Sequence, residues 1–114
     1  MTAQLLIVRA EGHRLGLPLE LVDEIVDRGA VITLPRRPAA IAGVIAVRGV
    51  AVPLLDAGAL AGGEMRRDRR TIVVGRDGRR PVALLVDDVE GIVDTAEADG
   101  PELLDLRTLL ERLA

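Results

Sequence analysis

The chain has 114 residues, a formal net charge of −3, and no Cys, Phe, Tyr or Trp. This length predicts one domain with an aliphatic core, and the missing cysteines exclude a disulfide framework, thiol catalysis and cysteine-ligated metal. No apolar run reaches the roughly 20 residues of a spanning helix and no targeting signal opens the chain, so we expect a cytoplasmic protein without membrane insertion.

The N-terminal segment predicts a strand and its return. Gln4 to Ala10 has apolar residues at five of its seven positions, on both faces, which is typical of a strand buried on both faces. Glu11 to Arg14 is a polar turn with His13 in the loop, and Leu15 to Leu17 returns from it. Because His13 is the single histidine of the chain, a histidine metal site has no second ligand.

The next segment has helical spacing of its apolar residues. Leu19-Glu20, directly after a proline, opens a short helical turn in this interpretation. We expect Gly29 to end the segment and Ala30 to Leu34 to form a short strand. The apolar residues at helical spacing are Leu21, Val22, Ile25 and Val26.

A hairpin is predicted in the centre of the chain. Two prolines make Leu34 to Pro38 an extended connector. The β-branched runs Gly43 to Val47 and Val50 to Leu55 are then separated only by Arg48 and Gly49, where glycine supplies a positive φ. Arg48 therefore lies at the tip, where a solvated turn residue is the simplest interpretation.

One pattern occurs twice, an aspartate followed by a short helix. Asp56 is placed to cap a helix over Ala57 to Leu60, which two glycines then end. Near the C-terminus, Asp105 precedes an apolar stripe at helical spacing. The repetition predicts two similar halves. The stripe consists of Leu106, Leu109, Leu110 and Leu113.

The segment from Met65 to Arg70 contains four arginines. We interpret it as a solvated connecting loop. The alternative is a diverged small β-barrel that binds nucleic acid through this loop together with Arg79 and Arg80. The negative net charge and the lack of stacking side chains disfavour that alternative.

A second hairpin follows, formed by Thr71 to Gly75 and Pro81 to Val86 around a turn at Asp77-Gly78. The next two residues, Asp87 and Asp88, point to opposite faces of a strand and so are not a converging acid pair. Because no catalytic constellation, phosphate loop or metal cluster is present in the sequence, we expect no enzyme activity, cofactor or metal.

Three stretches, in order, resemble the CheW-like domain, the coupling module of bacterial chemotaxis arrays. The central one, Pro35 to Asp56, reads Pro-x-x-Pro-x-x-Ile-x-Gly-Val-Ile-x-Val-Arg-Gly-x-x-Val-Pro-Leu-Leu-Asp, and Leu15 to Val26 and Leu84 to Val93 flank it. The resemblance covers nearly the whole chain. It implies a mainly β, CheW-like fold of two small SH3-like barrels with short helices, divided into subdomain 1 (1–38 plus 95–114) and subdomain 2 (39–94).

The resemblance also implies a function. CheW-like proteins are non-catalytic adaptors in which a groove between the subdomains receives a chemoreceptor's cytoplasmic tip. Other surfaces dock the regulatory domain of a CheA-type histidine kinase. The resemblance implies that the residues matching the family motif bind partners; they are Val22, Glu24, Gly43, Arg48, Gly49, Val86 and Val89.

These residues suit contact in different ways. Gly43 lets a helix approach without a Cβ in its path. Arg48 offers a planar fork to receptor carboxylates or carbonyls. Val86 and Val89 are weaker candidates for the groove wall, because β-branched strand residues ordinarily belong to the core.

The chain departs from the family pattern in two places. Ala46 stands where the family usually has asparagine, and only Asp94 to Gly100 stands where another strand is usual. We therefore expect the first barrel to lack a strand and to expose an edge beside Gln4 to Ala10 or Leu103-Leu104. An exposed edge predicts self-association unless the C-terminal helix or a partner covers it.

Overall fold

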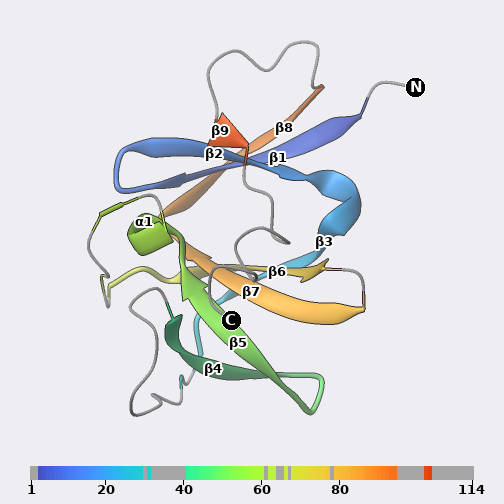
Figure 1. Ribbon diagram of the computed structural model, residues 1–114, viewed down its shortest axis with the longest axis vertical. Helices are drawn as coiled ribbons and strands as arrows, with labels where there is room; N and C mark the ends of the chain where they lie inside the picture. The colour runs from blue at the N-terminus through green and yellow to red at the C-terminus, as the bar shows by residue number, and fades with distance from the viewer. Residues whose placement is uncertain are drawn as a thin grey trace.

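The computed structural model describes residues 3–29, 31, 41–60, 62–63, 66, 68–77, 79–94 and 102–103. These residues form two sheets that pack on each other, with the first sheet above the second in Figure 1. The first sheet has the order β8 (Asp88–Asp94), β1 (Gln4–Ala10), β2 (His13–Pro18) and β9 (Glu102–Leu103). The second has the order β3 (Val22–Asp27), β6 (Thr71–Asp77), β7 (Arg80–Val86), β5 (Val50–Asp56) and β4 (Ile41–Val47).

Strand β1 lies inside the first sheet. It pairs antiparallel with β2 on one side and with β8 on the other. The expectation of an open edge beside Gln4 to Ala10 was therefore wrong, because β8 occupies that position. The edges of this sheet, among the described strands, are β8 and the two-residue β9, which pairs parallel with β2. Self-association through an edge stays a prediction.

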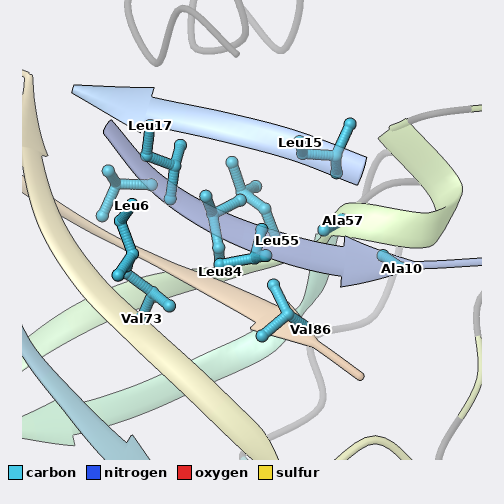
Figure 2. Packing of buried hydrophobic residues seen from close by; sticks show 11 residues of the cluster. Leu6, Ala10, Leu15, Leu17, Leu55, Ala57, Val73, Leu84 and Val86 are labelled. Atoms are coloured by element: carbon cyan, nitrogen blue, oxygen red, sulfur yellow. The ribbon is translucent and has the colours of Figure 1, made fainter. Parts of the chain in front are cut away.

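Two hydrophobic cores lie on opposite faces of the second sheet. Along β6, Val73 belongs to the inter-sheet core, whereas Ile72 and Val74 belong to the second-sheet core. The inter-sheet core joins β1 and β2 to β5, β6 and β7, as Figure 2 shows for residues such as Leu17 and Leu84. The two sheets are thus held together by aliphatic side chains from both.

The apolar sequence of β1 is explained by burial on both faces. Leu6 and Val8 are part of the inter-sheet core. Leu5 and Ile7, which alternate with them, are also buried, at 4% and 1% exposed. The prediction that this strand is buried on both sides is confirmed.

The predicted hairpins are present. Strands β4 and β5 pair with Val47 opposite Val50, so Arg48 and Gly49 form the two-residue turn. The β1–β2 hairpin turns in the same way at Glu11 and Gly12. In each turn the glycine and the residue before it have left-handed φ: 50° at Arg48 and 80° at Gly49, and 53° at Glu11 and 79° at Gly12. Positive φ at both central residues is the geometry that matches strand twist.

Two local predictions were wrong. Val22–Asp27 is a strand, and helical geometry is confined to the 3₁₀ turn η1 (Leu19–Leu21). Alternating burial along β3 shows a period of two, which fits its β-branched residues better than the helical spacing did. His13 begins β2 instead of lying in a loop. The proline-rich connector, the Ala30 to Leu34 strand and the C-terminal helix lie outside the described residues, apart from Val31.

The chain crosses between the sheets at short connections. It passes from the first sheet to the second through η1, which contacts both β1 and β6. It returns at Asp87, the single residue between β7 and β8. Strand β3 therefore belongs to the second sheet and β8 to the first, the reverse of their places in the expected subdomain ranges.

The strand orders have free ends, so neither set of described strands closes into a barrel. Among the described strands, the first sheet has four and the second has five.

Candidate functional site

The two edges of the second sheet approach each other at the tip of the central hairpin. Arg48, at the turn after β4, places its Nη2 atom 3.6 Å from Oε2 of Glu24 on β3. The Arg48 side chain is 79% exposed and that of Glu24 31%. The structure thus brings together two predicted binding residues that come from different motifs.

A depression of about 450 Å³ lies beside this ion pair. Its apolar lining includes Val26 of β3, Ile45 of β4 and Ile72 of β6, and Glu24 and Arg48 contribute charge. The depression therefore opens toward the second-sheet core between strands β3 and β4.

The two predicted glycines have different surroundings. Gly49 occupies the left-handed second position of the turn, at φ 80°, and nothing lies within 4 Å of where its Cβ would be. Gly43 is buried at the register shift between β4 and β5. The structure gives Gly43 little surface for the helix contact that the resemblance implies.

The three predicted valines lie at the inter-sheet core, apart from the Arg48 tip. Val22 and Val89 are partly buried and pack against this core. Val86 is a full member of it, at 0% exposed. A partner could contact Val22 and Val89 at the surface, whereas Val86 is covered.

Sequence reasoning missed two exposed isoleucines. Ile25 on β3 is 47% exposed and Ile92 on β8 is 52% exposed. Ile25 lies opposite Val73, and Ile92 lies opposite Leu6, so both point to the face that carries the inter-sheet core. This core therefore reaches the surface at two edge strands. We call Val22, Ile25, Val89 and Ile92 the aliphatic edge residues.

The arginine-rich loop is not simply a solvated connector. Arg69 is 2% exposed, and its side chain contacts the carboxylates of Glu11, Asp56 and Asp87. We call these four residues the Arg69 cluster. No local signal distinguished Arg69 from the other arginines, and its three acids are far apart in the sequence.

The exposed part of the loop pairs with acids as well. The Arg66 guanidinium donates two hydrogen bonds to Asp68, of 3.1 and 2.7 Å. These bonds lower the pKa of the Asp68 carboxyl and raise the pKa of Arg66. Because Arg69 is buried and Arg66 is paired, the described part of the loop does not present a continuous basic surface for nucleic acid.

The described ranges of the chain contain no helix long and apolar enough to cross a membrane. Within the same ranges, no three His, Cys, Asp or Glu side chains are grouped so that they could hold a metal ion.

Comparison with known proteins identifies relatives of this architecture. The family model of the CheW-like domain matches residues 4–110. Protein FrzA of Myxococcus xanthus is 39% identical over 88 residues, which are 75% of this chain and 55% of FrzA. This chain thus spans about half the length of that curated relative.

A solved structure has the same fold. The scaffolding protein TtCheW from Thermoanaerobacter tengcongensis superposes with a TM-score of 0.74 at 23% identity, over 82% of this chain and 66% of that one. The predicted mainly β, CheW-like fold is confirmed. Because the family match covers nearly the whole chain, this protein belongs to the CheW-like domain family.

Proposed function

We propose that this protein is a cytoplasmic, non-catalytic adaptor that couples a chemoreceptor's cytoplasmic tip to the regulatory domain of a CheA-type histidine kinase. The family match over residues 4–110 carries the proposal. The similarity to FrzA supports a role in chemotaxis or a related signalling pathway.

The geometry supports an adaptor because it offers contact surfaces of different chemistry. Val22 and Val89 pack against the inter-sheet core, and Ile25 and Ile92 are exposed on the same edge strands, which suits the apolar face of a helical hairpin. We assign the receptor tip to these residues, with Val22 and Val89 as the predicted contacts and Ile25 and Ile92 as additions.

The charged tip offers the second kind of contact. The pair of Arg48 and Glu24 is loose, at 3.6 Å, and its arginine is mostly solvated. An exposed pair of this kind contributes little to stability, so exchanging Glu24 for a partner's carboxylate costs little. Arg48 then supplies a planar donor fork that fits a carboxylate.

Binding measurements test the proposal. The full chain is titrated against a receptor cytoplasmic tip and a kinase regulatory domain, singly and together. We expect binding of each and a ternary complex, and recovery of neither partner contradicts the proposal.

Two variants locate the surfaces. Ile92→Glu should weaken receptor binding because it places a charge on an apolar contact. Arg48→Glu should weaken the binding of the partner whose carboxylate contacts the hairpin tip, because it replaces the guanidinium by a negative charge. Arg79→Glu is the matched control, since Arg79 is another exposed arginine in a hairpin turn, on the β6–β7 side of the same sheet.

A further inference from the structure

Arg69 is the largest fully buried side chain among the described residues, and it lies among three carboxylates. Its Nη2 atom is 2.6 Å from Oε1 of Glu11, its Nε 3.2 Å from Oδ1 of Asp87, and its Nη1 3.8 Å from Oδ2 of Asp56. The side chains of Arg69 and Asp56 are 0% exposed. A charge without solvent must be held by its neighbours.

The three acids come from both sheets and from the crossing between them. Glu11 is in the β1–β2 turn of the first sheet, and Asp56 is the last residue of β5 in the second. Asp87 connects β7 of the second sheet to β8 of the first. One guanidinium therefore touches each sheet and the residue that joins them.

Backbone hydrogen bonds hold two of these carboxylates in place. Oδ2 of Asp87 accepts from the Glu11 amide at 3.0 Å, and the Asp87 amide donates to the Arg9 carbonyl at 2.8 Å. Oδ1 of Asp56 accepts from the Ala59 amide at 3.0 Å, which is the predicted helix cap. The positions of the Asp87 and Asp56 carboxylates are thus set by backbone amides.

The short helix α1 (Ala57–Leu60) leaves space for the guanidinium. A Cβ at Gly58 would collide with Nη2 of Arg69 and would lie 2.6 Å from Cγ of Glu11. A Cβ at Gly63 would lie 2.9 Å from the same Glu11 carbon. Glycine at both positions therefore allows Arg69 and Glu11 to meet.

Stability alone does not account for this arrangement. Only Nη2 has a well-aligned hydrogen bond, to Glu11, whereas Nε and Nη1 are buried without one. The desolvation cost of a buried ion pair commonly cancels its attraction. Its hydrogen bond to Glu11 is directional, however, whereas the aliphatic contacts of the inter-sheet core are not.

We propose that Arg69 fixes the placement of the first sheet on the second by bridging Glu11, Asp87 and Asp56. By fixing this placement, Arg69 also positions the residues that a partner contacts when it binds to both sheets. This second part of the inference rests on the proposed function. The aliphatic edge residues come from both sheets, because Ile25 belongs to the second sheet and Ile92 to the first, so a partner that contacts both residues needs both sheets in place.

The placement is measured with two spin labels. The chain contains no cysteine, so Gln4→Cys on the first sheet and Arg79→Cys on the second introduce the two labelled positions without background. Double electron–electron resonance should give one narrow distribution of the distance between the two labels in the otherwise unchanged chain. Arg69→Met should shift or broaden it, and an unchanged distribution in a folded Arg69→Met chain overturns the proposal.

Two further variants control this experiment. Arg70→Met removes the adjacent, exposed arginine and should leave the distribution unchanged. Arg69→Lys keeps the charge but cannot reach three carboxylates with one planar fork. If Arg69→Met fails to fold, Arg69→Lys must show the broadening, and a narrow, unshifted distribution there overturns the proposal.

Binding separates this inference from the proposed function. If the original chain binds the receptor tip, Arg69→Lys should bind it about 10²-fold more weakly when the tip engages both sheets. Unchanged binding overturns the positioning step. If the original chain binds neither partner, the proposed function fails, while the spin-label result still decides whether Arg69 places the sheets.

Discussion

Two ion pairs of the same chemistry differ in almost everything except their residue types. Arg48 and Glu24 are 3.6 Å apart with the arginine 79% exposed, whereas Arg69 and Glu11 are 2.6 Å apart with the arginine 0% exposed. Water screens the first pair, and exposed pairs of this kind contribute about 0–1 kcal/mol. Burial removes that screening from the second, so the loss of one partner there leaves an uncompensated charge.

The difference assigns the two arginines to different tasks. A weak, solvated pair can exchange its partners, which is what a docking surface needs. A buried arginine among carboxylates from two sheets cannot be exchanged without moving one of the sheets. Mutations at Arg48 should therefore change binding alone, whereas mutations at Arg69 should change the structure and, through it, binding.

The largest effect is expected for Arg69→Met. Breaking a buried pair by removing one member costs about 3–5 kcal/mol of unfolding free energy, because the carboxylates of Glu11, Asp56 and Asp87 lose their cation. Chemical denaturation against the Arg70→Met control measures this. A loss of unfolding free energy below about 1 kcal/mol is what an ordinary surface substitution causes. That result would mean that Arg69 contributes no more to stability than the exposed Arg48.

Gly58→Ala should have an intermediate effect. The added methyl group collides with the Arg69 guanidinium, and overpacking of this kind costs about 1–3 kcal/mol. Gly29→Ala is the matched control, since nothing lies within 4 Å of the Cβ position there. In the Arg69→Met background the cost of Gly58→Ala should fall, and strict additivity of the two changes would contradict the steric explanation.

The smallest effect on stability is expected for Arg48→Glu. The turn tip is solvated, so the unfolding free energy should change by no more than about 0.5 kcal/mol. Partner binding should weaken nevertheless. Adding Glu24→Arg to the same chain exchanges the two charges of the pair, and it should not restore binding if the partner contacts the Arg48 side chain directly. Unchanged binding in both variants would reduce Arg48 to a turn residue.

Much of the fold could be predicted from local signals. β-Branched runs bounded by turn residues identify β4, β5, β6 and β7, and the apolar run of β1 predicts its burial on both faces. Strand β3 was misread because its few apolar residues also fit a helical period. Only pairing with β6, which is distant in the sequence, distinguishes the two periods.

The candidate site was less predictable than the fold. The motifs named Glu24 and Arg48 separately, and their contact depends on the arrangement of β3 and β4 at opposite ends of one sheet. Ile25 and Ile92 are ordinary strand residues until strand order places them on edges. The burial of Arg69 depends on three acids that only the assembled sheets bring together.

Backbone strain is shared by the two compared pairs. Glu11 and Arg48 each precede a hairpin glycine, and each holds a left-handed φ, 53° and 50°, that costs a residue with a Cβ roughly 1–2 kcal/mol. Asparagine or glycine would fill either turn at lower cost. A chain optimised for stability alone would therefore use neither a glutamate nor an arginine at these positions. The strain is the penalty for directing one long charged side chain from each turn toward another strand or toward a partner.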